Sequence, residues 1–198
     1  MMSQIYFNSR KGQTVLSPSE KRGLRFSHIV SMKELNQAEQ SNIQEGLFWL
    51  SGHKGDFIHD AFFSKLHKKL FGKVWKWAGV YRQTEKNIGI DYFKIPIEIK
   101  KLCDDLAFWI EHQTYESHEL LARFHHRLVY IHPYPNGNGR FSRILTNYLS
   151  QRQGWGALTW MGSLDPIARR ELYINALREA DIKNYEPLLD FFNQSLKE

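Results

Sequence analysis

The sequence predicts a mainly α-helical protein with one small β-hairpin. Apolar residues recur at helical spacing through most of the chain, and Ser-X-X-Glu signatures stand where two such patterns begin. The connections between periodic segments are short, which is typical of neighbouring helices in one bundle. β-Type residues around a turn-forming Lys-Asn pair supply the single hairpin.

Each predicted element has a local signal. Ser17 and Ser31 each precede a glutamate by three positions, so both are expected to cap helices. Gly46 weakens the first long helix and is expected to interrupt or join it. The hairpin is predicted within residues 80–94. The expected helices cover residues 32–50, 59–71, 96–113, 117–131, 140–153, 165–180 and 186–196.

Composition and charge narrow the class of protein. The 198 residues suit one domain, and the single cysteine, Cys103, excludes a disulfide framework and a Cys-ligated zinc site. No apolar run reaches the length of a membrane span and the first residues are polar, so we expect a cytoplasmic protein without membrane contact. The net charge of +6 favours a polyanionic partner, either nucleic acid or a nucleotide, unless it only makes the surface basic.

The stretch His132-Pro-Tyr-Pro-Asn-Gly-Asn-Gly-Arg-Phe-Ser-Arg143 carries the chemistry. Gly137 and Gly139 directly precede a predicted helix, whose free N–H groups and partial positive charge suit a phosphate. Arg140 and Arg143 lie three apart and share a helix face. The loop lacks the Gly-Lys-Ser/Thr ending of a Walker A motif.

His132 lies at the rim of this loop. A neutral imidazole accepts a proton from a hydroxyl, so a base beside a phosphate cradle predicts transfer from a nucleotide to an alcohol. The alternative is structural: a glycine-rich turn whose histidine caps a helix and whose arginines pair with surface carboxylates. The neighbouring His125 and His126 lack metalloprotease spacing and face different ways, so we predict no metal site there.

These residues resemble the signature of the Fic (Fic/DOC) family, H-x-F-x-(D/E)-G-N-G-R-x-x-R, with Tyr134 in place of Phe. The segment from Leu70 through Trp77-Ala-Gly to Arg82 is similar to the family segment that enters its hairpin flap. Ser17-Pro18, Leu35-Asn36 and Glu39 resemble the subgroup called mobile mystery protein B. The resemblance covers most of residues 15–195. It implies a Fic-type helical bundle, with an N-terminal arm and inhibitory helix in residues 1–55 and a catalytic core in residues 56–198.

The resemblance also implies adenylylation of a Ser, Thr or Tyr hydroxyl on a target protein, with ATP as donor. His132 would take the hydroxyl proton, Arg140 would stabilise developing charge, and Arg143 would hold the γ-phosphate. Gly137, Asn138 and Gly139 would cradle the phosphates. The flap would dock an extended target segment by strand addition. The flap residues named for that contact are Lys86, Asn87 and Ile88.

Two further positions refine this expectation. Tyr173 is predicted either to contact adenine, by similarity, or to be a core aromatic. Asn136 stands where the family has an acidic residue that helps hold Mg²⁺. Because an amide brings no charge, the resemblance implies a weakened hold on Mg²⁺, and with it a slower enzyme or a donor other than ATP.

Ser41-Asn-Ile-Gln-Glu45-Gly resembles the family's inhibitory motif, (S/T)-x-x-x-E-(G/N). By that resemblance Glu45 would pair with Arg143 and occupy the γ-phosphate position, with Ser41 one turn earlier. Two alternatives remain open. One is a Fic-like nucleotide-binding or regulatory module with little transfer activity, favoured by Asn136 and Glu45. The other is a nucleic-acid binder, which rests on charge alone.

Overall fold

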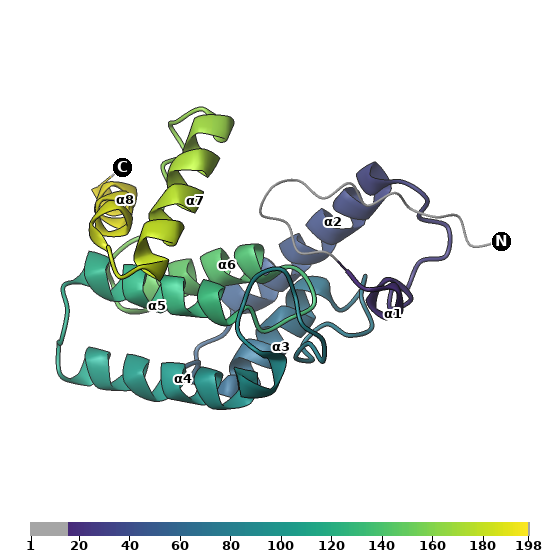
Figure 1. The fold of residues 1–198 in the computed structure, drawn as a ribbon, viewed down its shortest axis with the longest axis horizontal. Coiled ribbons are helices and arrows are strands. Elements are labelled where there is room, and N and C mark those ends of the chain that lie inside the picture. The colour runs from purple at the N-terminus through teal and green to yellow at the C-terminus, as the bar shows by residue number, and fades with distance from the viewer. Residues whose placement is uncertain (1–15, 198) are drawn as a thin grey trace.

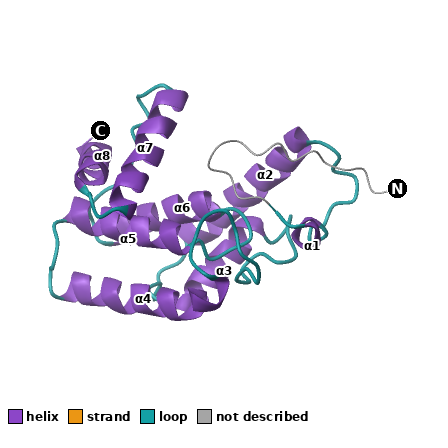
Figure 2. Cartoon of the chain, viewed as in Figure 1, coloured by secondary structure: helices purple, strands orange, loops and turns teal. Residues whose placement is uncertain are grey.

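The computed structural model describes residues 16–197, and helices joined by loops form all of its named elements (Figure 2). None of the helices in this part of the chain is long and apolar enough to span a bilayer. The helices are α1 (Pro18–Lys21), α2 (Met32–Ser51), α3 (Asp60–Phe71), the 3-10 helix η1 (Tyr92–Lys94), α4 (Ile95–Glu111), α5 (Ser117–Ile131), α6 (Asn138–Arg152), α7 (Pro166–Asp181) and α8 (Glu186–Lys197).

Capping side chains fix the first helices as the sequence predicts. Ser17 and Glu20 form a complete capping box at α1, and Ser31 and Glu34 form another at α2. The helix α2 runs through Gly46 without a break. A Cβ at that position would meet Leu70 of α3 at 2.8 Å, so the glycine permits a close crossing of the two helices rather than an interruption.

The helix α5 is the centre of the bundle. It packs against α4, α6, α7 and α8, and Figure 1 shows α4 running along one side of α5 while α7 rises on the other side. Its inward side chains, including Leu121, Phe124 and Leu128, are completely buried. At 25 cal/mol per Å² of apolar surface, each such side chain contributes roughly 1.5–3 kcal/mol. The core therefore holds α5 rigidly up to its last residue, which directly precedes His132.

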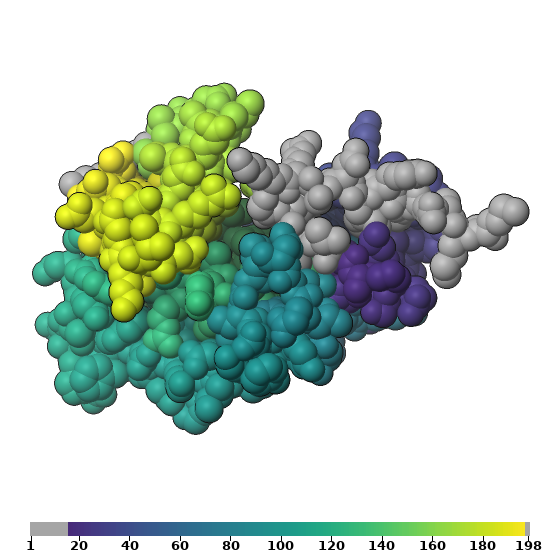
Figure 3. Space-filling view, viewed as in Figure 1, coloured from purple at the N-terminus to yellow at the C-terminus, as the bar shows by residue number. Residues whose placement is uncertain are grey.

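The segment around α1 is attached to the loop that follows α3. Lys76 N donates to Gly23 O at 2.8 Å, and the Trp77 indole N–H donates to Glu20 O at 3.0 Å. Leu24 and Trp75 form an isolated antiparallel bridge. In Figure 3 α1, in purple, lies at the end of this face opposite to the yellow C-terminal helix.

The predicted hairpin is absent, which corrects the sequence-based expectation for residues 80–94. Residues 83–91 form bends and irregular backbone, followed by η1. An isolated two-stranded hairpin is only marginally stable, and here side chains take the backbone groups that strand pairing would use. The Arg82 guanidinium binds the carbonyls of Thr84 and Ile90. We call residues 83–91 the covering loop.

Candidate active site

The left-handed turn after α5 carries His132. This residue is the C-cap of α5 with φ of 54°, and its N–H donates to Leu128 O at 3.3 Å. Few non-glycine residues adopt this conformation, so it turns the chain sharply away from the helix axis. Five residues later Gly137, with φ of 82°, is the N-cap of α6. The loop thus joins the C-terminus of one core helix to the N-terminus of another.

Asn138 holds this loop closed. Its side chain is buried and accepts from Tyr134 N at 2.9 Å while donating to Tyr134 O at 2.7 Å. The amide of Asn138 is therefore engaged by its own loop. Gly137 packs so tightly that a Cβ at this position would lie 2.7 Å from the Phe71 ring. Gly139 has more space, because the nearest group to a Cβ there would be the Arg143 guanidinium at 3.7 Å.

His67 of α3 contacts the same loop through Tyr134 and the Asn136 carbonyl, a role that the sequence did not predict. Gly79 N donates to its Nδ1 at 3.0 Å, so its Nε2–H donates to the Asn136 carbonyl at 3.1 Å. The ring stacks on Tyr134 with centroids 3.7 Å apart. Burial lowers the pKa of His67 to about 3, so the ring stays neutral and keeps this donor pattern. Its position four residues from both Phe63 and Phe71, on the apolar face of the predicted helix, was the available signal.

His132 is a buried, neutral imidazole. Only 5% of the residue is exposed, and burial, reinforced by the charge of Arg82, lowers its pKa to about 4. At neutral pH the ring is therefore unprotonated and able to accept a proton. The covering loop passes directly above it, because a Cβ at Gly89 would approach the His132 Cβ to 2.6 Å.

The two arginines of the loop have different partners. Arg140 binds Glu39 of α2 at 2.7 Å, and the other oxygen of Glu39 accepts from the Trp75 indole at 2.7 Å. Arg143 lies over the ring of Tyr173, 5.9 Å from its centroid. Both arginines are only partly buried beside the first turn of α6, whose free N–H groups add positive potential.

Glu39, not Glu45, is the carboxylate that α2 brings to the loop. Glu39 is 3% exposed and lies in the buried stripe of α2 with Leu35 and Ile43, four residues on either side. Glu45 and Ser41 lie on the exposed face, and Glu45 pairs with Lys73. Among residues 16–197 no ion pair joins Glu45 to Arg143, so the contact expected from the inhibitory motif is not formed. The four-residue spacing to Leu35 and Ile43 was the signal in the sequence for Glu39.

Tyr173 is a core residue that orders polar groups. Its hydroxyl lies 2.8 Å from His125 Nε2, and His125 Nδ1 lies 2.9 Å from the Thr146 hydroxyl. The Thr146 hydroxyl donates to Ser142 O, so His125 Nδ1 is the donor to Thr146 and Nε2 accepts from Tyr173. Burial raises the pKa of Tyr173 and lowers that of His125 to about 3. Tyr173 thus connects Arg143 to the buried face of α5.

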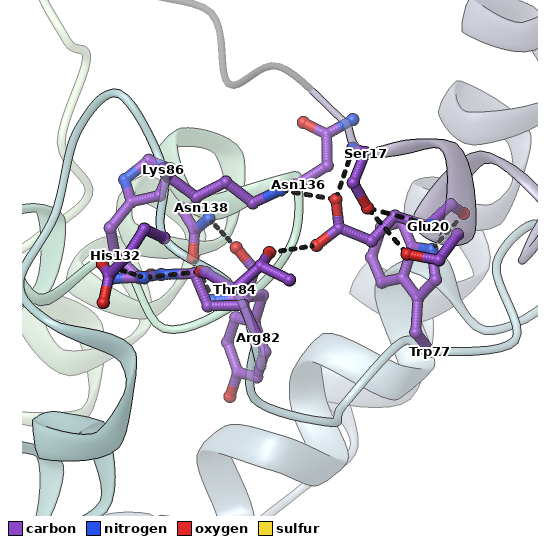
Figure 4. A network of polar contacts seen from close by, with 12 residues as sticks. Ser17, Glu20, Trp77, Arg82, Thr84, Lys86, His132, Asn136 and Asn138 are labelled. Carbon is purple, nitrogen blue, oxygen red and sulfur yellow. Dashed lines mark hydrogen bonds and ion pairs between the residues drawn. The ribbon is translucent and has the colours of Figure 1, made fainter.

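The three flap residues named from the sequence are not equivalent in the covering loop. The side chain of Lys86 is buried and its ammonium pairs with Glu20 of α1, as Figure 4 shows. Glu20 also accepts from the Thr84 hydroxyl at 3.2 Å. Asn87 and Ile88 are exposed. The guanidinium of Arg82 and the carboxylate of Glu20 therefore hold the covering loop, and its tip at Asn87 and Ile88 faces solvent.

The residues present do not make a site for a resident metal ion. The Asn136 side chain supplies only a neutral oxygen, and that oxygen accepts from Gly137 N at 2.7 Å. In the described part of the chain no three His, Cys, Asp or Glu side chains converge as metal ligands. His125 contacts Thr146 and Tyr173, and His126 contacts Asp181 and Tyr185.

The fold and the site define an α-helical protein with a buried histidine beside a glycine-rich helix N-terminus and two arginines. Residues 57–150 match the model of the Fic/DOC family. This part of the chain is therefore similar to the Fic/DOC family domain, as the sequence motif indicated.

Known proteins of this family share both sequence and fold with the chain. It is 32% identical over 107 residues to "Protein adenylyltransferase Fic" of Culex quinquefasciatus, which covers 52% of this chain and 21% of that protein. It is 30% identical over 131 residues to the protein of the same name from Nematostella vectensis, covering 64% of this chain and 30% of that protein. The matched region thus spans less than a third of these relatives.

Solved structures of Fic proteins have the same fold. BepC of Bartonella tribocorum, solved with bound AMPPNP, superposes with a TM-score of 0.70 at 20% identity and covers 94% of both chains. Residues 134–508 of Fic-1 from C. elegans give a TM-score of 0.69 at 23% identity, covering 92% of this chain and 56% of that one.

Proposed function

We propose that this protein is a protein adenylyltransferase that transfers AMP from ATP to a hydroxyl side chain of a target protein. The observation that carries the proposal is the neutral, buried imidazole of His132 at one end of a loop whose other end is the N-terminus of α6. A base and an anion site held five residues apart on one rigid loop are what transfer to an alcohol requires. The names of the relatives support the same activity.

The reaction follows from these groups. His132 accepts the proton of a target Ser, Thr or Tyr hydroxyl as its oxygen attacks the α-phosphorus of ATP. The new bond joins that oxygen to phosphorus, the bond from the α-phosphorus to the bridging oxygen breaks, and pyrophosphate leaves with the electron pair. Arg140 and Arg143, with the α6 N–H groups, stabilise charge on the phosphates. The exposed tip of the covering loop, Asn87 and Ile88, would receive an extended target segment by strand addition.

The position of the label in ATP tests this function. The protein is incubated with ATP carrying ³²P on the α-phosphate and, in parallel, on the γ-phosphate, together with Mg²⁺ and a cell lysate. Adenylylation labels protein from the α-position only, whereas a kinase would label from the γ-position only. Intact-protein mass spectrometry checks for an added AMP. Absence of α-label under all conditions would reject the proposed activity.

A second candidate function is a nucleotide-binding or regulatory module in which α2 restrains the site. The observation in its favour is the pairing of Arg140 with the buried carboxylate of Glu39. A fixed negative charge beside an anion site opposes the binding of phosphate. Under both functions α2 is inhibitory through Glu39, and Glu45 on the exposed face is not required.

Substituting Glu39→Gln is expected to tighten ATP binding about tenfold, which corresponds to 1.4 kcal/mol. Glutamine keeps an acceptor for the Trp75 indole but removes the charge that holds Arg140. Isothermal titration calorimetry with ATP measures the change. Glu45→Gln is the matched control on the same helix and is expected to leave the dissociation constant unchanged. Equal constants in the two variants would contradict the inhibitory role of Glu39.

Substituting Asn136→Asp is expected to lower the Mg²⁺ concentration for half-maximal transfer about tenfold. A carboxylate adds the charged oxygen that Mg²⁺ prefers and that the amide lacks. Transfer measured across a Mg²⁺ titration at fixed ATP gives this value. Asn193→Asp on α8 adds the same charge away from the loop and serves as control. An identical Mg²⁺ dependence in wild type and Asn136→Asp would show that this position does not act on the metal.

A further inference from the structure

The guanidinium of Arg82 lies between two backbone segments and is almost completely buried, with 1% of the residue exposed. On one side its Nε donates to the His132 carbonyl at 2.8 Å, and Nη2 reaches Ile131 O at 3.4 Å. On the other side Nη1 donates to Thr84 O at 3.0 Å and Nη2 donates to Ile90 O. One side chain therefore joins the turn of His132 to both ends of the covering loop (Figure 4).

The backbone of Arg82 adds a further contact to the same turn. Its N–H donates to Pro133 O at 2.9 Å. The carbonyls of three consecutive residues, 131 to 133, thus all accept from Arg82. Since His132 is in the left-handed conformation, these bonds oppose relaxation of the turn to a commoner backbone geometry.

Arginine is chemically required for this arrangement. Its planar fork presents five donors, enough to reach carbonyls in two directions, whereas a lysine ammonium is a compact point donor. The partners are neutral carbonyls, and the nearest carboxylate, Glu85 at 3.7 Å, is 57% exposed. Burying a charge with so weak a counter-ion is costly, so ion pairing does not explain the position.

We propose that Arg82 is a positioning residue, which fixes the turn that orients His132 and the loop that covers it. This inference rests on the proposed function for its catalytic consequence. Its structural part concerns His132 itself and is measurable without transfer. The charged groups that face the His132 ring are Arg82 and Lys86, and Lys86 is paired with Glu20.

Two variants separate the fork of Arg82 from its charge. Arg82→Lys keeps the charge but cannot bridge the two segments, and Arg82→Gln removes both properties. The control is Arg152→Gln, because Arg152 also donates to loop carbonyls, those of Gly55 at 3.1 Å and Lys54 at 3.3 Å, far from His132 in the sequence. Circular dichroism and thermal melting establish that each variant is folded.

Hydrogen exchange and NMR titration give the first readouts. Amide exchange in residues 84–90 is expected to accelerate about tenfold or more in both Arg82 variants and to be unchanged in Arg152→Gln. The His132 pKa, followed by ¹³C-labelled histidine, is expected to rise in both Arg82 variants because the loosened loop lets water reach the ring, and to rise about one unit further in Arg82→Gln, which also loses the positive charge. A structural role that does not involve His132 would leave this pKa at its wild-type value in both variants.

Transfer activity gives the second readout. Both Arg82 variants are expected to lose about a hundredfold in kcat, with KM for ATP changed less than about threefold. Wild-type exchange in the covering loop of Arg82→Lys would overturn the proposal, as would a wild-type His132 pKa in Arg82→Gln. If Arg82→Gln does not fold, the exchange measurement on Arg82→Lys decides alone. If exchange and pKa respond as expected while no protein transfers AMP, the proposed function fails and the positioning role stands.

Discussion

Replacing His132 with asparagine is expected to lower AMP transfer by a factor of about 100 to 10,000, the usual contribution of a general base. His132 is the imidazole on the loop that joins α5 to the N-terminus of α6, and burial keeps it neutral. Asparagine cannot take the proton of the attacking hydroxyl. Binding of ATP should change little, because the α6 N–H groups and the arginines remain. The prediction is therefore a loss in kcat with a nearly constant dissociation constant for ATP.

The choice of asparagine keeps the backbone unchanged. At φ of 54° most residues are strained, but asparagine adopts the left-handed region readily, whereas alanine would add a conformational cost. The control is His126→Asn on α5, since His126 binds Asp181 at the end of α7 and Tyr185 just before α8. It should retain activity within about twofold. Full activity in His132→Asn would remove the base from the mechanism.

Acidification is expected to destabilise the protein steeply between about pH 6.5 and 4. Burial holds the pKa of His67 and of His125 at about 3, and burial with the charge of Arg82 holds that of His132 at about 4. The unfolded chain binds these protons near pH 6.5, so below that value it carries more protons than the folded state. The contribution of these neutral histidines to the free energy of unfolding is fully present above pH 6.5. It is lost as the pH falls toward their pKa values in the folded state.

The expected loss is large compared with the stability of an ordinary domain. Each of the three histidines lowers the free energy of unfolding by about 2 kcal/mol at pH 5 relative to neutral pH. Together they lower it by about 6 kcal/mol, against a typical total of 5–15 kcal/mol. Urea unfolding at pH 7.5, 6.5, 5.5 and 5.0 measures this slope. His125→Gln removes one titrating group and should reduce the slope by about a third, whatever its effect at pH 7.5. A stability that is constant over this range would contradict the buried neutral histidines.

The sequence alone determined the helices and the motif. Capping boxes at Ser17 and Ser31, and the apolar period of residues 117–131, depend on neighbours within four residues, so local rules suffice. The glycine-rich stretch and His132 were found for the same reason. Their spacing along the chain is itself the geometry of a loop between two helices.

Only the tertiary structure decided which groups meet at that loop. The hairpin predicted around Lys86 is a loop because Arg82, at the start of the segment, binds its carbonyls, and Glu20 of α1, outside the segment, pairs with its lysine. Glu39 rather than Glu45 reaches the motif because the crossing of α2 over α3 determines which face of α2 is buried. The contacts of Glu20 with Lys86 and of Glu39 with Arg140 join residues far apart in sequence, and a short motif carries no information about them. The local pattern therefore determined which residues form the loop, and long-range packing determined which charges face it.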